Sequence, residues 1–349
     1  MITAIEQGLI FALLALGVFL TYRILDLPDL TVDGSFTTGG GTAAILIYNG
    51  WDPLLATACG FVTGSLAGLV TGLLHTKLKI DGLLASILTM IALYSVNLRI
   101  MGGPSVGVNL REGQKLHHLF TDLKDANLLY SGEMVAILAA VVLVALVGIN
   151  WFLSTDFGLA VQATGDNPGM AMSDGISTDY TKIVTLMLSN GLVGLSGALY
   201  VQFNGSADST MGVGLILVGL ASVIIGNAVL GTRFMVLATL GAVVGSILYR
   251  LIILWALSWE FNFGDVHIAT DPGDMKLISA VLVIIALLIS HLASKHGITF
   301  NPLSRWWSKT GAPEPLTSSA LAPVPPAVVP DADTPDSDAR APWADEEEL

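Results

Sequence analysis

The chain has few charged residues and a single cysteine. Asp, Glu, Lys and Arg together make up 12% of its 349 residues, about half of the fraction found in a typical soluble domain. Hydrophobic residues make up 53%, which is typical of a protein that crosses a membrane. Because Cys59 is the only cysteine, an intramolecular disulfide is excluded.

The sequence also lacks the patterns of several functional classes. It contains no G-x-x-x-x-G-K-[ST] phosphate-binding loop, so we do not expect it to bind ATP through that motif. No nucleophile, base and orienting residue can be grouped, and the dispersed histidines do not predict a metal site. No basic stripe indicates nucleic-acid binding. We therefore expect no catalytic residues, no metal, no cofactor and no nucleic-acid partner.

The net charge of −13 comes mainly from the end of the chain. Residues 311–349 contain nine acidic residues and one Arg, and this segment is rich in Pro, Ala and Ser with few large apolar residues. Such a composition cannot bury enough apolar surface to fold. We therefore predict two regions: a transmembrane domain over residues 1–300 and a cytoplasmic, mostly disordered acidic tail over residues 301–349.

Apolar stretches along the first region predict an all-α polytopic membrane protein. Nine can be distinguished, at approximately residues 4–24, 36–48, 54–75, 82–101, 132–153, 183–202, 211–230, 234–257 and 276–293. The second has only about 13 residues, whereas a straight span needs roughly 20. We therefore expect a broken or re-entrant second segment and a total of eight to ten spans.

The basic residues near the ends of these stretches predict their orientation. No Lys or Arg precedes the first stretch, which indicates a retained first helix that starts outside. Placing the polar segment 154–181 inside gives eight basic residues in the cytoplasm and six outside. The inner set is Arg23, Lys77, Lys79, Lys182, Arg233, Lys295, Arg305 and Lys309, and the outer set is Arg99, Arg111, Lys115, Lys124, Lys276 and Arg250, the last near a helix end. The bias agrees with the positive-inside rule.

The polar segment 154–181, between two apolar stretches, has its own internal pattern. Short apolar clusters alternate with glycines, and Asn167-Pro168 is a typical turn and helix start. This pattern predicts one or two short amphipathic helices outside the membrane. Because loops with internal patterning often carry function, we expect another protein to dock there.

This segment resembles the cytoplasmic coupling loop of permeases in the branched-chain amino acid type of ATP-binding-cassette (ABC) importer, and more closely that of their tryptophan/tyrosine-transporter-like relatives. The residues that carry the resemblance and would contact the ATPase are Gly158, Ala163, Thr164, Gly165, Asn167, Pro168, Met170, Ala171 and Gly175. Residues 27–36 and 79–85 are also similar, so that the resemblance covers roughly residues 1–300.

The resemblance implies a subunit of the bacterial plasma (inner) membrane that is surrounded by lipid and paired with a second permease subunit, for which it favours an identical copy in a homodimer. Each coupling loop would sit in a groove of a separate cytoplasmic ATPase, and an extracytoplasmic binding protein would deliver the solute. Aromatic or branched-chain amino acids are the substrates that the analogy suggests.

Polar residues in or beside the apolar stretches are candidates for the substrate pathway. They are Asp33, Gly34, Ser35, Thr37, Thr38, Thr89, Asn97, Ser189 and Asn190. The first five could belong to a discontinuous helix whose backbone faces the substrate. Alternatively, Asp33 caps a helix and the remaining residues make hydrogen bonds between helices. No acidic residue is expected in the middle of a span, which argues against a proton-driven carrier.

Glycines recur every four residues in the third stretch, at Gly60, Gly64, Gly68 and Gly72. Such a ridge of small residues is typical of a packing face, either within one subunit or between two. The pattern Gly-x-Val-x-Gly-Ser starts at Gly60 and again at Gly241, in stretches predicted to run in opposite directions. This is a candidate inverted repeat, as found in many transporters, although chance matches are common in such sequences.

Two arginines, Arg99 and Arg111, lie near the predicted outer mouth and are candidates for docking the binding protein by complementary charge. The alternative is that Arg99 extends to the membrane interface and Arg111 pairs with a nearby acid. For the chain as a whole, the alternative to an ABC permease is a stand-alone secondary transporter or channel. A membrane scaffold without transport would leave the polar residues of the spans poorly explained.

Overall fold

The computed structural model describes residues 2–107, 131–231 and 234–257, together with residues 261–263, 266–268, 280–281, 283–284 and 288. The chain divides into two units, residues 1–304 and 305–349, and all described residues belong to the first. Arg111, the predicted tail over residues 301–349 and most of the ninth apolar stretch lie outside the described residues.

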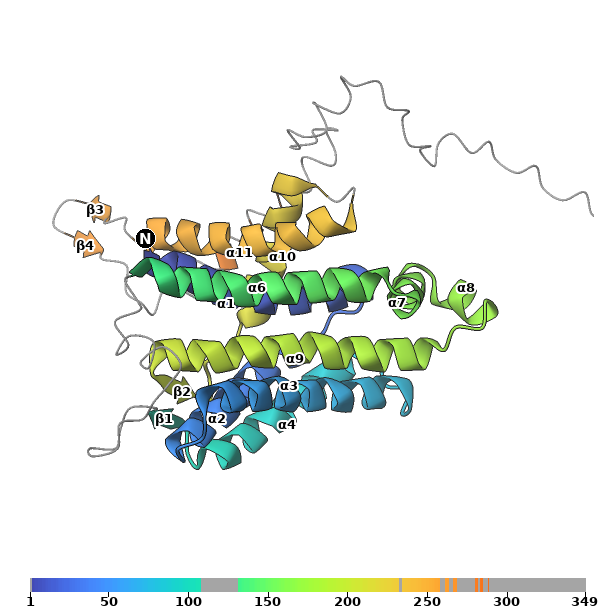
Figure 1. Cartoon of the computed structure of the whole chain (residues 1–349), viewed down its shortest axis with the longest axis horizontal. Helices are drawn as coiled ribbons and strands as arrows, with labels where there is room; N and C mark the ends of the chain where they lie inside the picture. Colours follow the sequence, from blue (N-terminus) through green and yellow to red (C-terminus); the bar gives the residue numbers. More distant parts are fainter. Residues whose placement is uncertain are drawn as a thin grey trace, which may run out of the picture. The chain divides into compact units, whose positions relative to one another are not determined.

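The described part is almost entirely helical (Figure 1). Its helices are α1 (Ile2–Val18), the π-helix η1 (Phe19–Ile24) that continues it, α2 (Thr31–Tyr48), α3 (Pro53–Thr76), α4 (Gly82–Met101), α6 (Ser131–Ser154), α7 (Asp156–Asp166), α8 (Pro168–Ser173), α9 (Thr178–Asn204), α10 (Leu215–Leu230) and α11 (Met235–Leu257). Two antiparallel pairs of short strands complete it, β1 (Ser105–Gly107) with β2 (Ser206–Asp208) and β3 (Phe261–Phe263) with β4 (Val266–Ile268).

Six helices of the described part are long and apolar enough to cross a membrane. They are Ile2–Ile24, Pro53–Thr76, Gly82–Met101, Met134–Ser154, Thr178–Asn204 and Met235–Ala256, and Leu215–Leu230 is a shorter apolar helix. The prediction of a helical, polytopic membrane protein is therefore confirmed in outline.

The second helix differs from the prediction of a broken segment. Helix α2 runs without interruption from Thr31 to Tyr48, which corresponds to about 27 Å at the usual rise per residue. It begins earlier than its apolar part because Asp29 Oδ1 accepts a hydrogen bond from the Thr31 amide at 2.9 Å. Its polar first half can be helical inside the protein because neighbouring helices supply hydrogen-bond partners.

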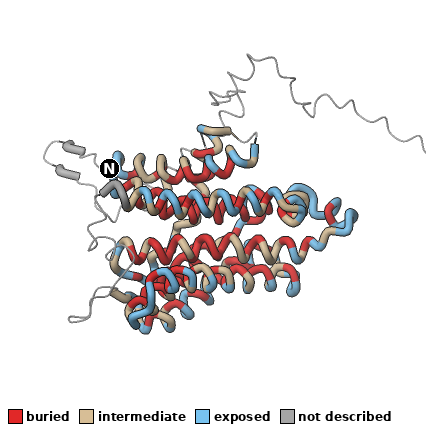
Figure 2. Tube along the Cα trace, in the orientation of Figure 1, coloured by how far each residue is buried: buried red, intermediate tan, exposed pale blue. Residues whose placement is uncertain are grey.

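Helices α1 and α9 have the most enclosed surfaces among the spans, as the long red segments in Figure 2 indicate for α9. Helix α9 packs against α3 on one side and against α1 and α2 on others. By contrast, α4 and α6 keep many apolar side chains at the surface. This difference is expected of a membrane protein, in which peripheral helices face lipid and central helices face other helices.

The glycine ridge of α3 is a packing face within this chain. A Cβ atom added to Gly60 would lie 2.8 Å from Ala198 Cβ, and one added to Gly72 would lie 3.1 Å from Ile183 Cα, both on α9. At Gly64 and Gly68 it would overlap the backbone carbonyls of Asn190 and Leu186. Small residues here let the two backbones approach, so the packing interpretation is confirmed and the contact lies inside one subunit.

Polar contacts identify which helix ends lie together. Pairing of β1 with β2, with Val106 opposite Ala207, joins the ends of α4 and α9. At the opposite end of α9, Asp179 forms ion pairs with Lys77 at 3.5 Å and with Lys79 at 3.6 Å. Both lysines lie just after the end of α3. The three residues of this second end belong to segments that the basic-residue rule places together in the cytoplasm.

Candidate functional site: the coupling loop and the polar network

The segment 154–181 forms two short helices, as its sequence predicts. Thr155 caps α7, since its Oγ1 accepts a hydrogen bond from the Gly158 amide at 3.1 Å. Asn167 ends α7 and caps α8, with its Oδ1 accepting from the Met170 amide at 3.0 Å, and Pro168 occupies the first position of α8. Figure 1 shows α7 and α8 at the end of the bundle, beyond α6 and α9.

One face of this loop is pressed against its own chain. A Cβ atom on Gly158 would overlap the carbonyl of Phe152, and one on Gly165 would overlap the carbonyl of Ile24, the last residue of η1. Thr164 is buried, and its Oγ1 lies 3.0 Å from Thr181 Oγ1 at the start of α9. Ala171 is also buried. These residues fix the loop to the ends of the membrane helices.

The other face is open. Asn167, Pro168 and Gly175 are exposed, and the side chains of Met170 and Met172 are 64% and 58% exposed. Ala163 is intermediate. Exposed methionines provide flexible apolar surface of the kind that binding interfaces use. The predicted contact residues therefore fall into two groups. The inner face, which packs against the chain itself, contains Gly158, Thr164, Gly165 and Ala171. The outer face contains the exposed residues Asn167, Pro168, Met170 and Gly175.

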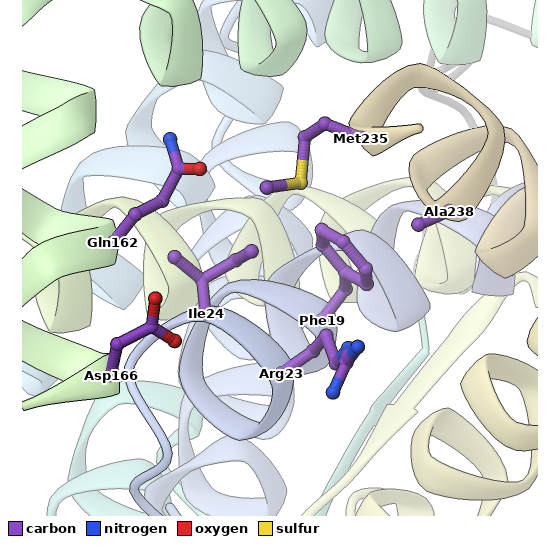
Figure 3. A pocket seen from close by; sticks show the side chains of 7 residues that line it. All are labelled: Phe19, Arg23, Ile24, Gln162, Asp166, Met235 and Ala238. Atoms are coloured by element: carbon purple, nitrogen blue, oxygen red, sulfur yellow. The ribbon is translucent and has the colours of Figure 1, made fainter. Parts of the chain in front are cut away.

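A pocket of about 240 Å³ lies where the loop meets the membrane helices (Figure 3). It is lined by Phe19, Arg23, Ile24, Gln162, Asp166, Met235 and Ala238, from η1, α7 and the start of α11. The π-helix on its wall is a form often found at functional sites. The pocket leaves space between α7 and the ends of the helices that it contacts.

The predicted role of Asp33 as a helix cap is correct in kind, but the capped helix is a different one. Asp33 lies within the first turn of α2, where its Oδ2 accepts from the Gly214 amide at 2.7 Å and its Oδ1 from the Ile216 amide at 2.9 Å. It thus caps α10 from a helix far away in the sequence. Asp33 is buried, but it lies in the first turn of α2, so it does not contradict the expectation that no acidic residue lies in the middle of a span.

Two groups of the candidate pathway residues meet across helices. Ser35 Oγ donates to Asn190 Oδ1 at 2.7 Å, and Asn190 Nδ2 donates to Asp29 Oδ2 at 2.7 Å. Thr38 Oγ1 donates to Asn97 Oδ1 at 2.8 Å. These contacts join α2 to α9 and to α4. Asp29 was not a candidate from the sequence, although an acid two residues before a helix start is a recognisable signal for a capping role.

The remaining candidates make hydrogen bonds that involve backbone groups. The Gly34 carbonyl accepts from Asn97 Nδ2 at 3.4 Å, and Thr37 Oγ1 accepts from the Gly212 amide at 3.2 Å. Thr89 donates to a carbonyl of its own helix, and Ser189 donates to the carbonyl of Gly17 on α1. Because all these side chains are buried with partners, the alternative interpretation as hydrogen bonds between and within helices agrees with their geometry.

Asp29 lies in the connection between η1 and α2 and is fully buried. Burial raises the pKa of its carboxyl above the usual range, while hydrogen bonds from Thr31 and Asn190 act in the opposite direction. Removal from water dominates because it disfavours the charged form. Arg99, the described member of the two docking candidates, is exposed in the last turn of α4, at the end where β1 and β2 pair.

Comparison with known proteins gives the following matches. Residues 1–290 match the family described as branched-chain amino acid transport system / permease component. The chain is 38% identical to a tyrosine transport system permease protein of Clostridioides difficile over 83% of this chain and 91% of that protein. It is 28% identical to a probable branched-chain amino acid transport permease protein of Methanocaldococcus jannaschii, over 85% and 90% of the two chains. It is 30% identical to an inner membrane ABC transporter permease protein of Escherichia coli, over 84% and 80%. No solved structure matches this chain.

Proposed function

The chain belongs to the branched-chain amino acid transport system permease family of ABC importers, and from this membership we propose that it moves an amino acid across the membrane as one of two identical permease subunits. It is a membrane-embedded transport subunit and not itself an enzyme. Importers of this family also comprise an ATPase and a substrate-binding protein, and for this reason the alternative of a stand-alone carrier or channel is set aside.

An aromatic amino acid is the proposed substrate. The support is the 38% identity to a protein named for tyrosine transport, with a branched-chain amino acid as the second candidate because another relative is named for that class. The fold itself does not select between them.

The outer face of α7 and α8 is the proposed contact with the ATPase. Met170 and Met172 expose apolar surface at the end of the helix bundle. In the proposed arrangement a protein partner, and not lipid, covers this surface. The Asn167 cap holds α8 in a fixed direction. A small rigid helix with exposed apolar residues fits a groove on a soluble partner.

The inner face is the proposed transmission element. Because Gly165 touches the carbonyl of Ile24 directly, a movement of α7 must also move the end of η1 or open their contact. The chain continues from Ile24 to Asp29, whose side chain accepts a hydrogen bond from Asn190 in the middle of α9. ATP-driven movement of the loop would therefore reach the polar network of α2, α4 and α9, which we propose borders the pathway.

Further features of the assembly complete the proposal. Helices α2 and α10, added to the six long spans and the ninth apolar stretch, would give nine segments. An inverted repeat is supported by the opposite directions of α3 and α11: the end of α3 and the start of α11 both lie near the coupling loop. Arg99 at the outer end, together with Arg111, remains the proposed docking point for the binding protein. The residues after 300 are proposed to form the cytoplasmic tail.

The contact with the ATPase can be tested with Met170→Glu. A buried, unpaired charge in the interface costs several kcal/mol, so we expect at least about tenfold less ATPase to co-purify with the permease. Leu78→Glu is the matched control, because Leu78 is 65% exposed in the connection that follows α3 at the same end. The measurement is the ratio of ATPase to permease after affinity purification from membranes.

Both variants must insert equally, as judged by the amount of permease in the membrane fraction. Full co-purification and full uptake with Met170→Glu would remove α8 from the proposed interface. Equal losses in Met170→Glu and Leu78→Glu would show a general sensitivity to charge at this end of the bundle, and would also contradict the proposal.

A further inference from the structure

Arg250 is a basic residue inside the helix bundle. The sequence places it near an outer helix end, but it lies seven residues before Leu257, the last residue of α11. Its Cζ atom is 4.2 Å from the centroid of the Phe11 ring. Phe11 is nine residues beyond the first residue of α1, about 14 Å along that helix. The guanidinium therefore points into the bundle and does not extend along α11 to its nearer end.

The ring under the guanidinium belongs to a cluster of three aromatic side chains, Phe11, Phe36 and Tyr200. Phe11 and Phe36 are stacked with centroids 5.9 Å apart, and Tyr200 lies 5.6 and 5.5 Å from the two. The three rings come from α1, α2 and α9. Phe11 is 2% exposed and Phe36 is fully buried. The cluster is therefore enclosed by helices, away from the surface that faces lipid.

The charge of Arg250 has no carboxylate partner in the part of the chain that the structure describes. The ion pairs recorded there join Lys77 and Lys79 to Asp179. The Nε atom of Arg250 is enclosed and lacks a hydrogen-bond partner among the described residues, while the residue as a whole keeps some exposure. A cation at membrane depth is costly and usually marks a functional site, and one cation–π contact offsets only part of that cost.

We propose that Arg250 binds the carboxylate of the transported amino acid and that the cluster of Phe11, Phe36 and Tyr200 contacts its side chain. This inference rests on the function proposed above. The planar guanidinium can donate two parallel hydrogen bonds to a carboxylate. Aromatic rings beside it provide an apolar surface that suits an aromatic or aliphatic side chain. The site thus pairs a fixed positive charge with an apolar wall, which are the two chemical features of such a substrate.

A phospholipid phosphate would satisfy the same guanidinium. The position of the charge favours the solute, because the guanidinium lies over a ring that is buried among α1, α2 and α9. A purely structural role for Arg250 would require only the contact with Phe11. The two alternatives therefore differ from the proposal in whether the solute changes the accessibility of Arg250.

The first test uses the unaltered protein, assembled with its ATPase and binding protein in vesicles. The complex is treated with phenylglyoxal, an arginine reagent, and modification at Arg250 is measured by mass spectrometry of its peptide. We expect saturating tyrosine to slow this modification at least about fivefold. Tyramine, which has the ring and the amine but no carboxylate, should have no effect. Unchanged modification with tyrosine, equal protection by tyramine, or no modification of Arg250 under any condition would overturn the inference.

The second test measures tyrosine uptake by variants in the same vesicles. A hydrogen-bonded charge pair contributes roughly 1.5–3 kcal/mol, so Arg250→Gln should lower uptake at limiting substrate by about 10- to 100-fold. Arg250→Lys keeps the charge without the fork and should lose less. Leu254→Ala, on the same helix with an exposed side chain, is the control and should resemble the unaltered protein. Each variant must co-purify with the ATPase in the usual ratio.

The outcomes separate the two levels of the argument. If the unaltered complex takes up neither aromatic nor branched-chain amino acids, the proposed function fails and this inference fails with it. If the unaltered complex transports tyrosine and Arg250→Gln transports it equally well, only the inference about Arg250 is wrong. Protection of Arg250 by anionic phospholipid with no effect of tyrosine would assign the site to lipid and would also overturn it.

Discussion

Replacement of Asp33 by Ala would leave the start of α10 without its cap. Helix α10 begins after Gly214 and has no side-chain cap from its own sequence. Two of its first amides are satisfied by Asp33, at 2.7 and 2.9 Å. The first amides of any helix lack partners within the helix, and at this buried position water cannot easily replace the carboxylate. The negative charge also interacts favourably with the positive end of the helix dipole.

The magnitude follows from these two contacts. A hydrogen bond to a charged group contributes about 1.5–3 kcal/mol, so loss of both should destabilise the protein by about 3–6 kcal/mol. Asp33→Asn keeps a neutral acceptor and should cost about half as much. Asp52 gives the matched control, because it caps α3 through the amides of Leu54 and Leu55 at 2.8 and 3.3 Å but is exposed. Loss of an exposed cap usually costs about 0.5–2 kcal/mol.

The assay is thermal unfolding of the purified protein in detergent. We expect the midpoint to fall most for Asp33→Ala, less for Asp33→Asn and least for Asp52→Ala, in the ratio of these free energies. The rate at which a thiol reagent modifies the Leu215→Cys variant, made in a Cys59→Ser background, would report whether the start of α10 has opened. Equal midpoints for Asp33→Ala and Asp52→Ala, with no added access at Leu215→Cys, would refute the reasoning that burial makes the cap at Asp33 more important.

Two further predictions concern glycines whose contacts differ. Gly64→Ala should destabilise the protein by about 1–3 kcal/mol, because the added carbon meets the Asn190 carbonyl. Gly148→Ala on α6 meets nothing within 4 Å and should be neutral or stabilising in the same unfolding measurement. Gly165→Val should keep ATPase co-purification but uncouple ATP hydrolysis from uptake, because it separates α7 from Ile24 without altering the exposed face. Gly148→Val, where an added Cβ meets nothing within 4 Å, is its control, and uptake proportional to hydrolysis in both variants would contradict the coupling role of Gly165.

The segment 154–181 shows how much local sequence determined. Its helix starts at Thr155 and Asn167-Pro168 follow from side-chain capping and from the fixed backbone of proline, which act within three residues. The glycine ridge of α3 could be recognised as a packing face for a similar reason, since a period of four residues places glycines on one side of a helix. The partner of that ridge, α9, could not be identified from the spacing.

Helix α2 shows where local sequence was insufficient. Its first half is polar and rich in glycine, so apolar length alone predicted a short, broken segment. Partners far away in the sequence, such as Asn190 and Asn97, allow it to be a continuous helix. Likewise, Asp33 could be identified as a cap, but only the approach of Gly214 and Ile216 decided which helix it caps.

The sequence by itself determined that this chain crosses a membrane and that segment 154–181 forms two short helices, because hydrophobic length and helix capping depend on neighbouring residues. Tertiary structure alone decided which face of that segment is free, how the polar residues of α2 are satisfied, and that Arg250 lies over Phe11 inside the bundle. These features depend on contacts between residues that belong to different helices and are mostly far apart in the sequence, and such contacts are fixed by the packing of whole helices.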